Sequence, residues 1–473
     1  MIPRGARLHF IGIGGAGMSA LATVLLHRGF TVSGCDLRDS ETVRRIRDAG
    51  GEVLIGHHPV HLDGADVVVV SRAVAPDTGE VRAARARGLP TLHRAQVLGE
   101  VMGSGCGVAI VGTHGKTTTT AMLTRVLVAS GYDPTALIGA DVADLGGNAR
   151  AGAGRWIVAE VDESDGSLLH IAPHAAVLTS LDVTDHRDYY TSAAHLEQTF
   201  ARFLGGVSPD GFIAACTDHP GVRALCEGLG RPVVTYGFDE AAAIRGEILT
   251  QDGRTIRARV WTDGRPAGEL VLQVPGRHNV SNALAAVAAA GRIGVPLPAA
   301  LDALAGFRGV SRRFEVRGEA DGVLVVDDYA HNPVKVAAVL RAAREGWPDR
   351  RLIAIFQPHR FSRTRTTHAE FARAFDLADE VIVTEIYAAG EPPQPGISAR
   401  LIVDAIAAHR TVHYRPTTGK ALELAEALAA PGAIVLTLGA GDIGGAAGAL
   451  LARLAARGSA GVGSDHRRPG GSA

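Results

Sequence analysis

Short apolar segments that alternate with helical patterns constrain the fold of this chain more than any other feature. Clear examples are "LHFIGI" at 8–13, "GVAIVG" at 107–112 and "VLVVDD" at 323–328, each followed by a segment of helical periodicity. Strands that are apolar throughout and are separated by helices predict α/β architecture with parallel sheets. Because 473 residues exceed what one hydrophobic core supports, we expect roughly three domains of ~150 residues each.

Glycine-rich and charged segments suggest where these domains meet. The sequence predicts a Rossmann-like N-terminal domain at 1–103, a central P-loop ATPase-like α/β domain at 104–318, a C-terminal Rossmann-like α/β domain at 319–457, and a disordered tail at 458–473. Within the central domain, "TIRARVWT" and "GELVLQV" alternate apolar and polar residues, which predicts antiparallel strands at the periphery of its sheet.

Composition excludes several classes of partner. Lysine plus arginine (48) nearly balances aspartate plus glutamate (49), so no global field attracts nucleic acid or an anionic membrane. Glycines interrupt the apolar run that follows Arg7, so we interpret it as a folded segment and expect no membrane insertion. Four cysteines without a C-x-x-C pair or a metal-ligand spacing with histidine favour a reducing, cytoplasmic setting.

A glycine loop follows the first strand. Gly12, Gly14 and Gly17 fit G-x-G-x-x-G between a strand and a helix, Gly15 lies within the loop, and Asp36 ends the second strand. Such a loop lets a diphosphate approach the helix N-terminus, which predicts a dinucleotide-like ligand. NAD, FAD and a UDP-sugar all satisfy this pattern. Ser71, at the end of "ADVVVVS", is a further candidate for the same ligand.

A second loop, "GTHGKTTTT" at 112–120, resembles a phosphate loop but is shorter than G-x-x-x-x-G-K-[ST], whose first glycine would stand at Ile110. Its glycines would expose backbone N–H groups to phosphate, Lys116 would neutralise charge and Thr117 would bind Mg²⁺. The chain has only two other lysines, Lys335 and Lys420, so a lysine here indicates a need for a compact ammonium. The alternative is a helix capped by Thr117.

Carboxylates follow two strands near this loop. "WIVAEVDESDG" contains Glu160, Asp162, Glu163 and Asp165, and "LDVTDHRD" contains Asp185 and His186. Because ligands of open α/β sheets bind at the carboxyl ends of strands, Glu160 and His186 are candidate metal ligands. An acidic turn that caps a helix and a structural histidine are the alternatives.

Later motifs place further polar side chains at the ends of predicted strands and helices. Asn279 and Asn282 share a helical face and suit either an adenine edge or a helix cap. Arginine pairs suit phosphate, and histidines at strand ends suit a small ligand. The members of these motifs are Arg312, Arg313, Asp327, Asp328, His331, His359, Arg360, Arg363 and Arg365.

Taken in order over nearly the whole chain, "GTHGKTTTT", "AEVDESDGS", "GRHNVSNALAA", "DDYAHNP", "QPHRFSRT" and "YAAGE" resemble the Mur ligase family, whose phosphate loop has this shortened form. The resemblance is strongest to members that add L-alanine to UDP-N-acetylmuramate. It implies an ATP- and Mg²⁺-dependent ligase that forms an acyl phosphate, with these two small molecules as substrates.

The resemblance also implies roles for individual residues. The UDP-sugar would bind Gly12, Gly14, Gly15, Gly17, Asp36 and Ser71. ATP would bind Gly112, Thr113, His114, Gly115, Lys116, Thr117, Thr118, Asn279, Asn282, Arg313 and Asp328. Thr117, Glu160 and His186 would hold the metal, and Lys116, Glu160, His186 and Arg313 would be catalytic. Candidates for the amino-acid site are His331, His359, Arg360, Arg363 and Tyr387.

Three other functions remain open. A recycling ligase of the same family would attach a peptide to the same nucleotide sugar, and Asn332 stands where the alanine-adding members have a second histidine. An NAD-dependent oxidoreductase would explain the first glycine loop but not Lys116. A nucleotide-binding regulatory module would leave the nearby carboxylates without a role.

Overall fold

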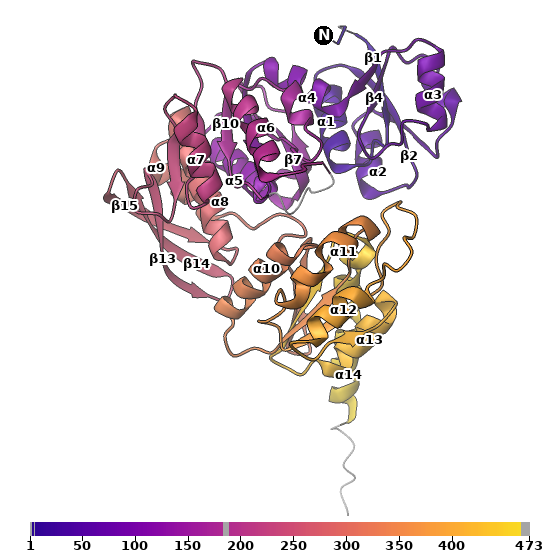
Figure 1. Cartoon of the computed structure of the whole chain (residues 1–473), viewed down its shortest axis with the longest axis vertical. Helices are drawn as coiled ribbons and strands as arrows, with labels where there is room; N and C mark the ends of the chain where they lie inside the picture. The colour runs from indigo at the N-terminus through magenta and orange to yellow at the C-terminus, as the bar shows by residue number, and fades with distance from the viewer. Residues whose placement is uncertain (1, 4, 183–188, 465–473) are drawn as a thin grey trace, which may run out of the picture. The chain divides into compact units, whose positions relative to one another are not determined.

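The computed structural model describes residues 2–3, 5–182 and 189–464. The chain divides into two compact units. The first contains residues up to Leu249 together with Arg257–Gln273 and His278–Val310, and the second contains Thr250–Ile256, Val274–Arg277 and the chain from Ser311 onward. Both are built from sheets covered by helices (Figure 1), which confirms the predicted α/β class.

The N-terminal domain is a five-stranded parallel sheet with the order β3-β2-β1-β4-β5. The strands are β1 (Arg7–Ile11), β2 (Thr31–Asp36), β3 (Glu52–Ile55), β4 (Val67–Val70) and β5 (Thr91–His93). The helices are α1 (Ala16–His27), α2 (Glu41–Asp48), η1 (Pro59–Leu62), α3 (Gly79–Ala86) and α4 (Arg94–Gly103). The strand order reverses at β1, so the glycine loop after β1 lies at the switch point where such sheets bind ligands.

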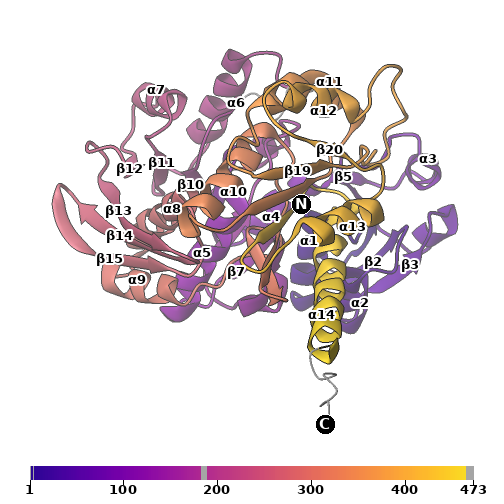
Figure 2. The same ribbon diagram turned by 90° about the horizontal axis from the view of Figure 1, so that it is seen from below.

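The central domain has a ten-stranded sheet with the order β15-β14-β13-β12-β11-β10-β6-β9-β7-β8. Its strands are β6 (Cys106–Val111), β7 (Thr135–Val142), β8 (Gly147–Arg150), β9 (Trp156–Glu160), β10 (Ala175–Leu178), β11 (Ile213–Cys216), β12 (Val234–Gly237), β13 (Ile244–Asp252), β14 (Thr255–Thr262) and β15 (Arg265–Leu272). Its helices are α5 (Lys116–Ala129), η2 (Ala143–Leu145), η3 (Ser167–His170), α6 (Ala193–Gly205), α7 (Pro220–Gly228), α8 (Arg277–Ile293) and α9 (Leu297–Ala305). The strands β13, β14 and β15 lie at one edge (Figure 2), which confirms the peripheral position predicted for β14 and β15.

Polar contacts join these two domains within the first unit. Asn148 on β8 donates to the carbonyl of Ala16 at 2.8 Å and to Ser19 Oγ at 2.9 Å, both on α1. Arg45 on α2 pairs with Asp141 on β7 at 2.7 Å. The helix that follows the glycine loop is therefore anchored directly to the central sheet.

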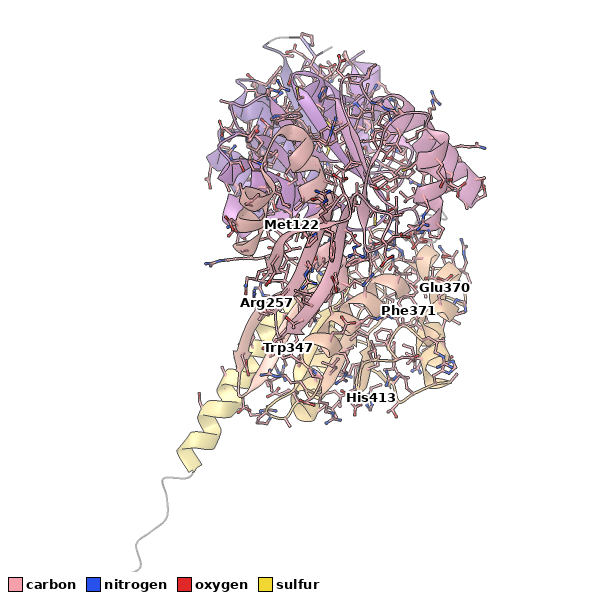
Figure 3. All side chains as sticks on the ribbon, turned by 90° about the vertical axis from the view of Figure 1, so that its left-hand side faces the viewer. Met122, Arg257, Trp347, Glu370, Phe371 and His413 are labelled. Atoms are coloured by element: carbon pink, nitrogen blue, oxygen red, sulfur yellow. The ribbon has the colours of Figure 1, made fainter. Side chains whose placement is uncertain are left out.

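The C-terminal domain has a six-stranded sheet with the order β16-β17-β21-β18-β19-β20, in which the β16–β17 pair is antiparallel and the other pairs are parallel. The strands are β16 (Glu315–Ala320), β17 (Val323–Asp328), β18 (Leu352–Phe356), β19 (Glu380–Val383), β20 (His413–Tyr414) and β21 (Ile434–Leu438). The helices are α10 (Pro333–Gly346), α11 (Phe361–Thr367), η5 (His368–Ala372), α12 (Arg400–Ala407), α13 (Thr418–Leu428), η6 (Asp442–Gly445) and α14 (Ala446–Ser464). The Phe371 ring, labelled in Figure 3, packs 5.0 Å from that of Phe356 in the core.

The structure differs from the sequence-based expectations at two places. The turn between β13 and β14 belongs to the second unit, because Gly253 N donates to Gly346 O at 2.8 Å and the Gln251 amide donates to Ala342 O at 2.8 Å. The helix α14 continues to Ser464, past Gly458, where the tail was predicted to begin. Arg457 holds this end of the helix by bonding to Asp321 at 2.7 Å.

Across the part of the chain that the structure describes, none of the helices combines the length and the apolar character that a membrane span requires.

Candidate functional site: the phosphate loop and its neighbours

The short loop after β6 depends on two glycines. Gly112 and Gly115 have φ angles of 120° and 82°, a region that residues with a Cβ rarely occupy. A Cβ on Gly112 would overlap Thr179 Oγ1, and one on Gly115 would overlap Asn282 Oδ1. Gly115 is the residue that caps α5, so Thr117 lies inside the helix. The alternative that Thr117 caps the helix is therefore wrong, because the glycine turn supplies the helix start.

Lys116 begins α5 and its ammonium reaches back across the loop. Its Nζ donates to Gly112 O at 2.6 Å and to the two carboxylate oxygens of Glu163 at 2.8 and 3.1 Å. Burial lowers the pKa of Lys116, but the charges of Glu163, Glu160 and Asp162 outweigh it and raise the pKa above its ordinary value. The side chain therefore stays positively charged at neutral pH although only 11% of it is exposed.

The carboxylates after β9 divide into different environments. Glu160 accepts from Gly139 N at 2.9 Å, and Glu163 is fully buried against Lys116. Asp162 pairs with Arg94 at 2.7 Å. Burial raises the pKa of Asp162, but Arg94 and Lys116, together with hydrogen bonds from Ser164, bring it down to about 2. Three negative charges thus face the start of α5.

The end of β10 supports the other side of the loop. Asp182 N donates to Thr113 Oγ1 at 2.9 Å, and Asp182 Oδ2 lies 3.0 Å from His114 Nε2. Thr117 and Thr118 are buried at the start of α5. The predicted metal candidate His186 and its neighbour Asp185 lie outside the described residues.

The two asparagines on α8 come to the same loop. Asn282 Nδ2 donates to Asn279 Oδ1 at 3.3 Å, which confirms that the two residues share one helical face. Thr119 Oγ1 on α5 donates to Asn282 Oδ1 at 3.3 Å. Both amides are buried, that of Asn282 beside Gly115, and both residues lie inside α8, so the helix-cap alternative does not describe them.

The first glycine loop joins β1 to α1 through a glycine in the left-handed region. Gly12 has a φ of 77°, and the N–H groups of Gly12 and Ile13 both donate to Cys35 O, at 2.9 and 3.0 Å. Asp36 Oδ2 accepts from Gly14 N at 2.9 Å, so this carboxylate also shapes the loop itself. A Cβ on Gly17 would stand 3.0 Å from Arg94 Nη1. Ser71 follows β4 and is half-buried, and Gly15 precedes α1 as its N-cap.

In the second unit, β17 ends in two buried carboxylates. Arg312 donates to Asp327 at 3.1 Å and to Gly439 O at 2.6 Å. Asp328 accepts from Phe314 N at 2.6 Å and from Ala330 N at 2.7 Å. Burial raises the pKa of Asp328 to about 6, against the opposing effect of Arg313.

Backbone strain gathers at the same segment. Arg312 and Phe314 both have positive φ, at 59° and 46°. Non-glycine residues adopt this conformation at a cost, and such residues cluster at functional sites. The guanidinium of Arg313 lies 5.0 Å from the centroid of the Tyr329 ring, which orients it by a cation–π contact.

Aromatic and imidazole rings line the ends of β17 and β18. His331 lies 5.9 Å from His359 between ring centroids, and His359 stacks on Tyr387 at 5.8 Å. Burial lowers the pKa of His359 to about 4, with Arg363 and Arg360 adding to the effect, so its ring is neutral at pH 7. The sequence-predicted residues His331, His359, Arg363 and Tyr387 are therefore brought together, while Arg360 is exposed at the start of α11 with a φ of 71°.

Asn332 is the N-cap of α10, so the helix engages its side-chain oxygen. Its side-chain oxygen accepts from Lys335 N at 2.9 Å, which is an N-cap. Within the described residues its Nδ2 is buried without a hydrogen-bond partner. The side chain thus has one structural role and one unused donor.

Comparison with known proteins identifies this set of loops. The description "Mur ligase family, catalytic domain" matches residues 7–105, "Mur ligase middle domain" matches 110–290 and "Mur ligase, glutamate ligase domain" matches 312–441. A UDP-N-acetylmuramate–L-alanine ligase of Solidesulfovibrio magneticus is 45% identical over 92% of this chain and 96% of its own length. The chain belongs to the Mur ligase family.

Further known proteins are similar to this Mur ligase over nearly its whole length. A UDP-N-acetylmuramate–L-alanine ligase of Rubrobacter xylanophilus is 45% identical over 95% of this chain and all of its own length. The crystal structure of a UDP-N-acetylmuramate-alanine ligase from Thermotoga maritima matches with a TM-score of 0.81 and 30% identity, over 96% of this chain and 100% of that one. A murein peptide ligase from Psychrobacter arcticus matches with 0.71 and 25%, over 95% and 99%.

Sequence reasoning gave no role to several residues that shape the candidate sites of each unit. Glu163 stood in the acidic segment after β9, but nothing in its spacing singled it out as the partner of Lys116. Arg94 lies on another domain and shows no motif, yet it pairs with Asp162 and leaves little room for a Cβ at Gly17. Tyr329 stood within "DDYAHNP", and an aromatic residue between acidic and histidine positions was the available signal.

Proposed function

We propose that this Mur ligase joins L-alanine to the carboxylate of UDP-N-acetylmuramate with hydrolysis of ATP to ADP and phosphate. The observation that carries the chemistry is the charged Lys116 at a short glycine loop, surrounded by the carboxylates after β9. The relatives that bear this activity in their names, at 45% identity over more than nine-tenths of the chain, support the choice of substrates.

A carboxylate does not react with an amine in water, so the carboxylate oxygen first attacks the γ-phosphorus of ATP and ADP leaves. The amine nitrogen of L-alanine then attacks the acyl carbon, loses a proton, and inorganic phosphate departs. Both steps develop negative charge on oxygen, which a preorganised ammonium or guanidinium stabilises. We assign this stabilisation to Lys116 and Arg313.

Further roles follow from the geometry of the first unit. The N–H groups of the loop at 112–115 and the start of α5 suit the ATP phosphates, and Asn279 and Asn282 suit the adenine edge. Thr117 and Glu160 offer oxygen ligands, the class that Mg²⁺ prefers, and His186 is a further candidate. When bound, Mg²⁺ would neutralise phosphate charge. The first glycine loop, with Asp36 and Ser71, suits the diphosphate of the UDP-sugar.

The second unit supplies the remaining groups. Asp328 suits the ATP ribose, and the neutral ring of His359 with His331, Arg360, Arg363 and Tyr387 suits a small amino acid. We place the reaction in the cytoplasm, where ATP and nucleotide sugars are made. The four cysteines are free thiols, as a reducing compartment requires.

The test is the purified chain with UDP-N-acetylmuramate, ATP and Mg²⁺, offered L-alanine, glycine, L-serine or a tripeptide. We expect ADP release and a product mass that require both UDP-N-acetylmuramate and L-alanine. Equal turnover of all four amines would refute the specificity, preference for the tripeptide would favour a recycling ligase, and reduction of NAD without ATP would refute the ligase activity.

The metal assignment has its own test. Glu160→Ala should raise the Mg²⁺ concentration needed for half-maximal activity while binding of the UDP-sugar persists. Loss of sugar binding with an unchanged Mg²⁺ requirement would contradict the assignment of these two sites to different domains.

A further inference from the structure

A second group of ligand-type side chains lies in the N-terminal domain, away from the phosphate loop. It lies between the sheet and α3, which covers one face of that sheet (Figure 1). His9 on β1, Cys35 on β2 and Glu80 on α3 are all buried, and one potential ligand atom from each lies within 4.8 Å of the others. His57 and His61, from the segment after β3, complete the group around Glu80.

Three donor atoms of this group already stand at nearly the spacing of a metal shell. Cys35 Sγ lies 3.2 Å from His57 Nδ1 and 3.2 Å from Glu80 Oε2, and His57 Nδ1 lies 2.8 Å from Glu80 Oε2. Tetrahedral Zn²⁺ with bonds of about 2.0–2.3 Å sets its ligand atoms roughly 3.3–3.6 Å apart. An outward shift of about half an ångström would therefore admit the ion.

His9 supplies an independent sign of a missing ligand. Its Nδ1 lies 3.0 Å from Ser33 Oγ, which fixes the ring, while its Nε2 is buried and, among the described residues, has no hydrogen-bond partner. A buried polar atom without a partner is costly, so native proteins rarely retain one without a reason. Metal-binding histidines commonly bond one ring nitrogen to an outer partner and use the other for the metal, and Ser33 is such an outer partner for His9 Nδ1.

Burial sets the protonation states of His9 and Cys35. Burial lowers the pKa of His9 to about 4, so this ring is neutral and its lone pair is available. Burial and the neighbouring Glu80 raise the pKa of the Cys35 thiol, so a bound cation would have to displace its proton. Glu80 is fully buried and accepts hydrogen bonds from His58 N at 3.1 Å and from the Cys35 thiol.

We propose that His9, Cys35, His57 and Glu80 bind a divalent cation of the zinc class, at a site separate from the Mg²⁺ that accompanies ATP. A thiolate and two imidazoles favour Zn²⁺ over Mg²⁺, which takes oxygen ligands. Binding of this cation does not depend on which amine the ligase uses as a substrate.

The cation would brace the first glycine loop. Cys35 O accepts the N–H groups of Gly12 and Ile13, so the residue that binds the metal through sulfur also holds the loop through its carbonyl. The opposite face of the same sheet carries the core formed with α1. Metal binding would therefore stabilise the strand ends that present the loop.

The test uses the full chain, stripped with a chelator and titrated with CoCl₂ and then ZnCl₂. We expect one equivalent of Co²⁺ to give a thiolate-to-cobalt charge-transfer band and the visible absorption of a tetrahedral site, and Zn²⁺ to abolish both. Cys35→Ser should lose the charge-transfer band. Cys226→Ser, a half-buried cysteine on α7, is the matched control and should keep it.

A second variant keeps the proposal testable if Cys35→Ser does not fold. His57 is partly exposed, so His57→Ala should fold and weaken Co²⁺ binding at least ~10-fold. Zn²⁺ should raise Tm in the parent chain and much less in His57→Ala. No charge-transfer band in the parent chain, or a band that persists in folded Cys35→Ser, would overturn the proposal.

Discussion

The close approach of Gly115 to Asn282 yields a prediction whose size follows from the structure. Gly115→Ala places a methyl group where φ is 82° and where it would overlap Asn282 Oδ1. The left-handed conformation alone costs roughly 1–2 kcal/mol for a residue with a Cβ. The overlap is relieved only if the Asn282 amide moves by roughly 1 Å, to an ordinary van der Waals separation from the new methyl group.

That movement has a further cost. Asn282 would lose its bonds to Thr119 Oγ1 and Asn279 Oδ1, both at 3.3 Å, at about 1 kcal/mol each. We therefore expect Gly115→Ala to destabilise the first unit by about 3–4 kcal/mol. At about 2–4 °C per kcal/mol for domains of this size, Tm should fall by at least ~6 °C.

Gly131, just past the other end of α5, provides a matched control. It follows α5 with a φ of 78°, and a Cβ there would meet nothing within 4 Å. Gly131→Ala should cost only the backbone term of about 1–2 kcal/mol. The two alanine variants therefore differ only in the contact with Asn282.

The assay is thermal unfolding of the transition that UDP-N-acetylmuramate shifts, because we assign this substrate to the first unit alone and a ligand stabilises only the unit that binds it. In an Asn282→Ala background, the cost of Gly115→Ala should fall to that of Gly131→Ala, a coupling of about 2 kcal/mol. Equal losses for Gly115→Ala and Gly131→Ala in the parent chain would refute the close approach, as would an unchanged cost in the Asn282→Ala background.

Three other outcomes are expected. Lys116→Ala should lower the ADP release rate at least ~10²-fold in a protein of unchanged circular dichroism, because a preorganised charge is lost; near-normal activity would contradict its role. The folded pKa of Asp162, about 2, is below the ordinary 3.8, so its stabilising contribution is present above pH 3.8 and lost as the pH falls toward 2. The Tm loss caused by Arg94→Gln at pH 7 should therefore shrink below about pH 4, and a constant loss would exclude Asp162 as its cause. Asn332→Ala should cost about 1 kcal/mol by removing the cap of α10, whereas Asn332→Asp should retain it; equal losses would point away from capping.

The sequence predicted those parts of the structure that depend on neighbours in the chain. The phosphate loop could be located because Gly112, Gly115 and Lys116 act through backbone conformation and helix position, which a short segment encodes. The shared face of Asn279 and Asn282 follows from helical periodicity alone. The α/β class follows from alternation of strands and helices.

Contacts between distant segments were not predictable in this way. The spacing of the cysteines and histidines indicated no metal site, yet Cys35, His57 and Glu80 converge because they come from one strand, one loop and one helix. The pairing of Lys116 with Glu163 was likewise hidden, since several carboxylates follow β9 and only the path of the chain selects one. The bond of Arg457 in α14 to Asp321 likewise joins residues that are far apart in sequence.

The turn between β13 and β14 determines where the C-terminal domain can be separated from the rest of the chain. The chain passes between the two units five times, after Leu249, Ile256, Gln273, Arg277 and Val310. A fragment that starts at Ser311 would lack Gly253, leaving the Gly346 carbonyl without the bond it makes in the full chain. A C-terminal fragment intended to fold alone therefore needs the turn at Thr250–Ile256 as well as the chain from Ser311 onward.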